Sequence, residues 1–271
     1  MFEQVVLGIK AAQGRLDVNP VSANLYQGSL AGTLGVNAND NSFVVKQKLT
    51  GVAVGPLLRD VADKDLLEGR GTVVLDVTTT GATVKALKKG LAGTTNVALK
   101  DGSIKGIDIP RTVRTARAAL GSKRALEQQA QGGAKTDFSE LTASFAIRNG
   151  IAHNEDLQAK SPLLRLAGRG DIDIGESTAD YTAKASVVGT STGQGGKDLT
   201  KVAGVTVPVR ATGPLDNLKY TVDVAALATD LAKDTLEREL ERRLGGGKSG
   251  KDQGTTDAVG DALRGLFGKP K

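Results

Sequence analysis

Residues 145–152 of the chain read Phe145-Ala146-Ile147-Arg148-Asn149-Gly150-Ile151-Ala152. Asn-Gly between two alternating runs is the strongest short signal for a β-hairpin, because a type I′ turn needs φ > 0 at both central residues. The pattern recurs at 97–104, around Asp101-Gly102, and more weakly at 9–16, around Gln13-Gly14. The copies are irregularly spaced, which indicates a repeated hairpin rather than a solenoid. The sequence therefore predicts antiparallel strands joined by tight turns.

Several other segments alternate apolar and polar residues with a period of two. They lie at 72–78, 171–174, 181–187, 205–209 and 218–224. Each predicts a strand with one apolar and one polar face, as expected of an antiparallel sheet that is solvated on one side. Alternation alone leaves two interpretations open. The apolar faces line a groove that holds lipid tails, or they pack on helices of the same chain.

The composition fits a thin apolar layer over a broad sheet better than a deep globular centre. Aromatic residues make up 3% of the 271 residues, and Trp is absent. Gly, with 35 residues against 7 Pro, suits many strands joined by tight turns. The absence of Cys excludes disulfides and thiolate metal sites. The mild net charge of +6, without a dense stripe of Lys and Arg, argues against nucleic acid as a partner.

Helices are expected at fewer places than strands. An Ala- and Arg-rich stretch predicts a helical insertion at about 110–133. The clearest helix is expected at about 225–244, where leucines lie along one side. The predicted organisation is a β-groove domain at 1–245, followed by a flexible Gly/Lys-rich tail at 246–271. That tail contains a short amphipathic segment at 257–267.

No group of residues in the sequence supports catalysis. His153 is the only histidine, and its place just after the Asn149-Gly150 turn indicates a surface residue. Asp171 and Asp173 are interpreted as polar residues on a solvated strand face rather than as a metal or acid pair. The Gly-rich segment 189–196 lacks the Lys-Ser/Thr ending of a phosphate-binding loop. We therefore expect a protein that is not an enzyme and that needs no metal or cofactor.

The start of the chain shows no targeting signal. No stretch approaches the roughly 20 apolar residues of a membrane span. Met1-Phe2-Glu3-Gln4 lacks the basic region and apolar core of a signal peptide. Strand-like sequence follows at once, which indicates a truncated chain whose targeting information is missing.

An ordered series of short motifs runs through the chain and is densest at residues 137–188. Its members are Pro56-Leu57-Leu58-Arg59-Asp60, Gly69-x-Gly71, Leu99-x-Asp101-Gly102-Ser103-Ile104-x-Gly106, Asp137-Phe138-Ser139-Glu140-Leu141-Thr142, Asn149-Gly150, Ser161-Pro162-Leu163-Leu164-Arg165, Gly168-x-Gly170, Tyr181 and Val207-Pro208-Val209-Arg210. The series closely resembles the C-terminal region of the AsmA family, and the resemblance covers about residues 5–230.

The resemblance implies a fold and a place in the cell. Members of the family are similar to bridge-like lipid transfer proteins, so we expect a mainly β chain with a few helices. Its antiparallel, strongly curved sheet would form an open apolar groove capped by amphipathic helices. An N-terminal helix, absent from this chain, anchors family members in the inner membrane of Gram-negative bacteria, with their bulk in the periplasm.

The resemblance also implies a function and partners. We expect a module that supports phospholipid transport between the inner and outer membranes and envelope integrity, with phospholipid acyl chains and envelope proteins as partners. The alternative is a structural or assembly factor that influences outer-membrane protein biogenesis through protein contacts. On the first interpretation the lipid-groove candidates are Val73, Leu75, Val77, Ile172, Ile174, Tyr220 and Val222.

Overall fold

The computed structural model of the chain describes residues 3–118, 126–129, 133–162, 164–188 and 206–222. The strands are β1 Glu3–Ala12, β2 Arg15–Leu25, β3 Gly28–Asn37, β4 Ser42–Ala53, β5 Leu67–Thr80, β6 Ala92–Lys105, β7 Leu126–Gln129, β8 Lys135–Arg148, β9 Ile151–Lys160, β10 Leu164–Asp173, β11 Thr178–Val187, β12 Thr206–Pro214 and β13 Lys219–Val222. The helices are α1 Val54–Ala62, α2 Val84–Lys89 and α3 Ile109–Ala118. The expected helix at 225–244, the tail at 246–271 and the segment 189–196 lie outside the described residues.

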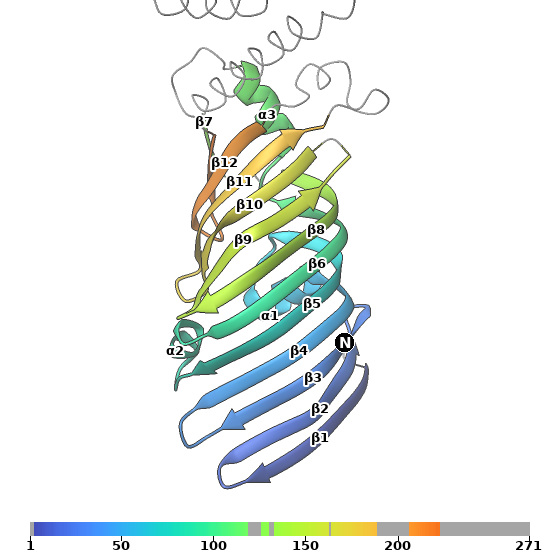
Figure 1. The fold of residues 1–271 in the computed structure, drawn as a ribbon, viewed down its shortest axis with the longest axis vertical. Coiled ribbons are helices and arrows are strands. Elements are labelled where there is room, and N and C mark those ends of the chain that lie inside the picture. Colours follow the sequence, from blue (N-terminus) through green and yellow to red (C-terminus); the bar gives the residue numbers. More distant parts are fainter. Residues whose placement is uncertain (1–2, 119–125, 130–132, 163, 189–205, 223–271) are drawn as a thin grey trace, which may run out of the picture. The chain divides into compact units, whose positions relative to one another are not determined.

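All thirteen strands belong to one sheet, in the order β1-β2-β3-β4-β5-β6-β8-β9-β10-β11-β12-β13-β7. Neighbouring strands are antiparallel, and all but β7 follow the order of the chain. Figure 1 shows that the strands cross the sheet obliquely and that the sheet twists and curves along its length. The predicted fold class, a mainly β chain with an open, curved antiparallel sheet, is thus confirmed.

Two of the three predicted hairpin turns are confirmed by their backbone angles. Asn149 and Gly150, between β8 and β9, have φ of 50° and 77°. Gln13 and Gly14, between β1 and β2, have φ of 52° and 77°. Both pairs therefore have the positive φ at two successive residues that a type I′ turn requires.

The hairpin predicted at Asp101-Gly102 is wrong, because β6 continues through both residues. Arg70 of β5 pairs with Lys100 and Glu68 pairs with Ser103, so two residues of β6 lie opposite the single residue Gly69. This count defines a β-bulge, and Asp101 has the positive φ of 49°. Asp-Gly favours positive φ in a bulge as well as in a turn, and here the long partner strands keep the chain in the sheet.

One row of directly paired residues runs across ten neighbouring strands of the sheet. It comprises Ile9, Val18, Leu34, Val45, Val77, Gly93, Ile147, Ala152, Ile172 and Ala179. No member has a polar side chain. At about 4.8 Å per strand, the row extends for about 43 Å. We call it the apolar row, and the face that contains it the inner face.

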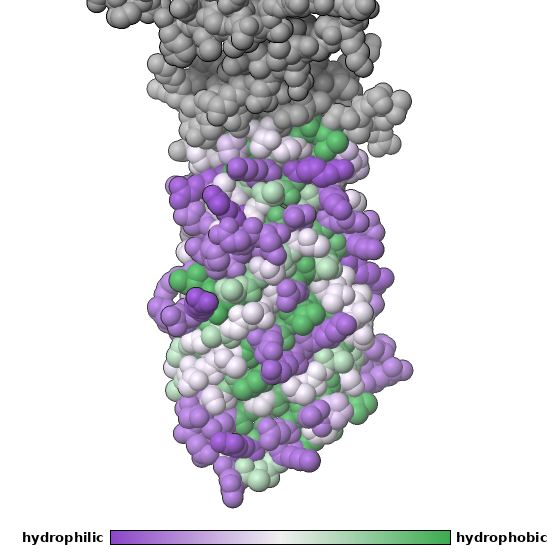
Figure 2. Space-filling model, in the orientation of Figure 1, coloured by the Kyte–Doolittle hydropathy of each residue, from purple (hydrophilic) through white to green (hydrophobic). Residues whose placement is uncertain are grey.

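The opposite, outer face has charged residues paired across strands. Lys46 binds Asp76 at 2.9 Å, and Lys160 binds Glu140 at 2.8 Å. Both pairs lie directly opposite each other in the strand register. In the view of Figure 2, hydrophilic residues are spread over all the strands, with hydrophobic residues between them. The alternation in the sequence thus separates an apolar from a charged face.

The helical insertion predicted at 110–133 is only partly present. Helix α3 occupies Ile109–Ala118, but Leu126–Gln129 forms β7, which pairs with β13 at the edge of the sheet. The sequence Leu-Glu-Gln-Gln has good helix propensity. The main-chain groups along the free edge of β13 hydrogen-bond this segment as a strand, and this tertiary pairing overrides a weak local preference.

Two contacts fix the helices on the sheet. Helix α1 packs on β5 and lies behind the strands in the view of Figure 1. The buried Thr136 of β8 holds the start of α3, because its hydroxyl donates to the carbonyl of Ile107 at 2.8 Å and accepts from the amide of Ile109 at 2.9 Å.

Candidate functional site

The inner face contains an apolar cavity of about 280 Å³. Its lining comes from strands β5, β6 and β8 to β13, from the start of helix α3 and from the segments at Leu66, at Ile107 and at Leu215. Among the twenty lining residues, only Tyr181 and Tyr220 have a polar side-chain atom. A cavity with this lining can hold hydrocarbon and offers very few groups for chemistry. We call it the tail cavity.

All seven lipid-groove candidates lie on the inner face, although only two line the tail cavity. Ile172 and Tyr220 contribute directly to its wall. Val73 pairs with the lining residue Val97, and Val222 pairs with the lining residue Val209. The rest of the set, namely Leu75, Val77 and Ile174, continues the same face, and Val77 packs in one cluster with Ile147, Ile172 and Ile174.

The candidates differ in how much of their surface remains free. Val73, Val77 and Val222 are buried by their neighbours within the protein. Leu75, Ile172 and Ile174 are only partly buried. Both interpretations of the alternating strands therefore apply locally, since some apolar side chains pack on one another and others face open space. That these residues bind lipid stays a prediction.

Sequence reasoning missed the lining residues that lie outside strands. Leu66, Ile107 and Leu215 belong to connections, where no alternation marks the face to which a side chain points. Leu66 lies next to β5 and Leu215 lies next to β12, two strands that are far apart in the sheet. Both residues nevertheless line the same cavity. The only sequence feature that could have indicated these lining residues is an apolar residue within an otherwise polar connection.

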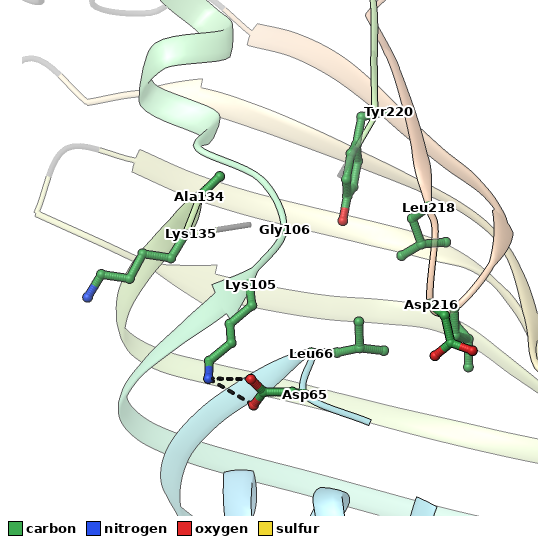
Figure 3. A pocket seen from close by; sticks show the side chains of 11 residues that line it. Asp65, Leu66, Lys105, Gly106, Ala134, Lys135, Asp216, Leu218 and Tyr220 are labelled. Carbon is green, nitrogen blue, oxygen red and sulfur yellow. Dashed lines mark hydrogen bonds and ion pairs between the residues drawn. The ribbon is translucent and has the colours of Figure 1, made fainter. Parts of the chain in front are cut away.

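A second, more polar cavity of about 420 Å³ adjoins the tail cavity. The two share Leu66, Leu215, Leu218 and Tyr220. Figure 3 shows Leu66 between the Lys105–Asp65 pair on one side and Asp216 on the other, with Leu218 above Asp216. We call this second cavity the polar mouth.

Ion pairs surround the polar mouth. Lys105 binds Asp65 at 2.8 Å and Glu68 at 2.6 Å, and Arg59 binds Asp65 at 3.0 Å. The hydrogen bonds that Lys105 donates to Asp65 and Glu68 raise the pKa of Lys105. The hydrogen bond from Lys105, more than that from Arg59, lowers the pKa of Asp65. These groups are therefore held in their charged forms.

A further ion pair joins the two sides of the mouth. Lys64, just after α1, binds Asp216 in the connection between β12 and β13. The two residues are far apart in the sequence and come from different parts of the sheet. This ion pair connects the part of the curved sheet next to β5 with the part next to β12, beside the tail cavity.

Tyr220 lies where the two cavities meet. Its side chain is buried, with 7% of the residue exposed, and burial raises the pKa of its hydroxyl. In Figure 3 the hydroxyl points towards Leu66 and Leu218. Among the described residues the hydroxyl has no hydrogen-bond partner. The hydroxyl oxygen is not itself fully buried, because Oε1 of Gln47 is the only fully buried side-chain polar atom without a partner in the described part of the chain.

Tyr181, the other tyrosine of the tail cavity, has a hydrogen-bond partner for its hydroxyl. Its hydroxyl donates to Oδ1 of Asn154, which is 1% exposed, and Asn154 Nδ2 donates to the carbonyl of Ser144 at 2.7 Å. Gly168 makes room for the ring, because a Cβ there would lie 2.8 Å from Tyr181 Cε1. The Gly168-x-Gly170 motif lies opposite a bulge in β9, where Glu155 and Asp156 face the single residue Arg169.

His153 lies on the outer face, away from both cavities. It contacts Asp171 through Nδ1 at 2.7 Å and Glu155 through Nε2 at 3.0 Å. The hydrogen bond to Asp171 is the main cause that raises the pKa of His153. The prediction of a surface histidine is confirmed. In the part of the chain that the structure describes, no group of acidic or His residues could hold a metal ion.

The fold and the two cavities define the class of the protein, an open, curved β-sheet with an apolar groove on its inner face. The chain belongs to the AsmA family, whose model matches residues 1–157. It is 23% identical over 245 residues to Protein AsmA of Escherichia coli (strain K12), covering 90% of this chain and 39% of the relative. The chain thus spans about two fifths of the length of that curated relative. No solved structure gives a significant match.

A membrane-crossing helix is not found in the described part of the chain. Helices α1, α2 and α3 are all too short and too polar for that role.

Proposed function

We propose that the chain is a non-catalytic module that holds phospholipid acyl chains against the inner face of its sheet. As part of an AsmA-family protein tethered to the inner membrane, it would act in the periplasm. There it would support phospholipid transport between the inner and outer membranes and the integrity of the envelope. The observation that favours this function most is the apolar row, because a lipid tail needs a continuous apolar surface.

The length of the apolar row suits such a ligand. It extends for about 43 Å, at about 4.8 Å for each strand, and continues past several partly buried side chains. Each CH₂ group that leaves water gains about 0.8 kcal/mol, so a tail of about 16 carbons gains on the order of 10 kcal/mol when fully desolvated. The tail cavity adjoins this surface through Ile172 and Ala179, which belong to both.

The test compares two neighbouring valines of β4. Val45 belongs to the apolar row on the inner face, whereas Val44 is on the outer face and 39% exposed. Phospholipid that co-purifies with the chain after gentle extraction is measured by native mass spectrometry for the wild type, V45E and V44E. We expect V45E to lose most of the bound lipid, because a carboxylate in the row repels a hydrocarbon tail. V44E should retain it.

A folding defect is separated from a binding defect by two further measurements. Thermal unfolding shows whether V45E is folded, and V45T, which adds one hydroxyl at a partly buried position, should weaken lipid retention at a smaller cost in stability than V45E. Repeated absence of lipid from the wild-type chain, or equal retention by V45E and V44E, would overturn the proposed function.

The second candidate function, an assembly role through protein contacts, is favoured by the exposure of β1. Strand β1 lies at an edge of the sheet and exposes four apolar residues by 50–61%, namely Val5, Val6, Leu7 and Ile9. Within the described residues β1 has a neighbouring strand on one side only, and such a strand can hydrogen-bond a strand of another protein. If this role is the correct one, V45E will leave envelope function intact in cells while V6E abolishes it.

A further inference from the structure

We propose that the polar mouth selects a zwitterionic phospholipid headgroup over an anionic one, with the Tyr220 hydroxyl donating a hydrogen bond to an oxygen between headgroup and tails. This inference rests on the proposed function, since it concerns which lipid the groove takes.

The arrangement of the two cavities matches the parts of a phospholipid. The tail cavity is apolar, the polar mouth is charged, and the two share Leu66, Leu215, Leu218 and Tyr220. A lipid whose tails occupy the tail cavity would therefore place its phosphate and ester oxygens beside Tyr220, and its headgroup in the mouth.

Tyr220 is equipped for this position. Its ring is part of the apolar wall, and its hydroxyl points along the mouth (Figure 3). Only 7% of the residue is exposed, and the hydroxyl has no partner among the described residues. Burial raises its pKa, so the hydroxyl keeps its proton and acts as a donor at neutral pH. A phosphate or ester oxygen that enters the mouth can accept a hydrogen bond from this donor.

The charges around the mouth are balanced. The cations Arg59, Lys64, Lys105 and Lys135 are matched by the carboxylates Asp65, Glu68, Asp137 and Asp216, and every cation is ion-paired. An anionic headgroup therefore finds no unpaired cation among these residues. A zwitterionic headgroup brings one charge of each sign and can join the pairs without leaving a surplus.

Asp216 is the residue best placed for the cationic end of such a headgroup. It is 70% exposed, whereas its partner Lys64 is only 16% exposed. A carboxylate accepts through two oxygens, so Asp216 can hold Lys64 and still accept from an ammonium group of the ligand.

The experiment measures headgroup preference with matched tails. The full chain is incubated with vesicles of dioleoyl phosphatidylethanolamine and dioleoyl phosphatidylglycerol in equal amounts and is then re-isolated. The bound lipids are quantified by mass spectrometry. We expect the ethanolamine lipid to be enriched about threefold, the effect of one exposed charge contact. D216N should abolish the enrichment, and Y220F should weaken retention of both lipids about tenfold without changing their ratio.

The control is D76N, which makes the same chemical change in the exposed Lys46–Asp76 pair of the outer face. It should leave both the amount and the ratio of bound lipid unchanged. Equal binding of the two lipids, enrichment of the glycerol lipid, or wild-type retention by Y220F would overturn the headgroup inference while lipid binding itself persists. Failure of the wild type to retain either lipid would instead overturn the proposed function.

Discussion

Gly93 is the one member of the apolar row without a side chain, and replacing it with alanine tests how the row is built. Its φ is +134°, and a Cβ there would lie 2.1 Å from the carbonyl oxygen of Asp76 and 2.7 Å from the Cα of Val77. Both obstacles are backbone atoms of β5. Gly93→Ala therefore requires β5 and β6 to separate where Val77 pairs with Gly93.

The size of the effect follows from these contacts. The unfavourable backbone conformation costs about 1–3 kcal/mol, and each ladder hydrogen bond that breaks costs about 1 kcal/mol more. We expect Gly93→Ala to lower the free energy of unfolding by about 3 kcal/mol, which lowers Tm by about 9 °C for a chain of this size.

Gly51→Ala is the matched control for that substitution. Gly51 also has a positive φ, +67°, but no atom lies within 4 Å of a Cβ built there. This variant meets only the backbone penalty of about 1 kcal/mol, so Tm should fall by about 3 °C. Thermal unfolding followed by circular dichroism at matched concentration measures both. If the two variants melt within about 1 °C of each other, the close approach of the β5 backbone is not the reason that a glycine is required at position 93.

Two further predictions concern polar groups that the sheet holds. The single histidine signal in NMR should titrate above the ordinary pKa of 6.5, and Asp171→Asn should lower it, because the hydrogen bond between His153 Nδ1 and the Asp171 carboxylate is the main cause of the raised pKa. Since the folded pKa is raised, this contact stabilises the fold below the unfolded pKa, and the contribution is lost as pH rises through the folded value; an unshifted pKa would contradict the contact. Asn154→Ala leaves the Tyr181 hydroxyl and the Ser144 carbonyl without their partner, so urea denaturation should show a loss of about 2–3 kcal/mol. A loss below about 0.5 kcal/mol would show that water replaces the amide.

The sequence was informative where local chemistry decides the conformation. Asn149-Gly150 forms the predicted hairpin turn, because its positive φ values and the short connection leave one geometry for antiparallel strands. Asp101-Gly102 has the same residue chemistry but lies inside β6, where pairing to β5 and β8 on both sides holds the strand straight. Dipeptide chemistry predicts positive φ at both places and does not distinguish a turn from a bulge.

The candidate site was predictable only in part for the same reason. Alternation identified Ile172 and Tyr220 as inner-face residues, and both line the tail cavity. It did not identify Leu66 or Leu215, because their positions depend on where the two sides of the rolled sheet meet. The polar mouth could not be predicted from the sequence either. Its ion pair Lys64–Asp216 joins residues that come together only through the register of many strands.

The apolar row is exposed at one end and enclosed at the other. Ile9 on β1 is 61% exposed, whereas Ala179 on β11 is 9% exposed and belongs to the wall of the tail cavity. The edge of β13 is covered by β7, but no strand among the described residues covers β1. The polar mouth lies at the enclosed end. A phospholipid bound with its headgroup in the mouth would therefore have its tails directed along the row, towards β1. On this arrangement Val45 on β4 contacts tails and Asp216 contacts headgroups, so V45E should reduce retention of every phospholipid while D216N changes only the choice among them.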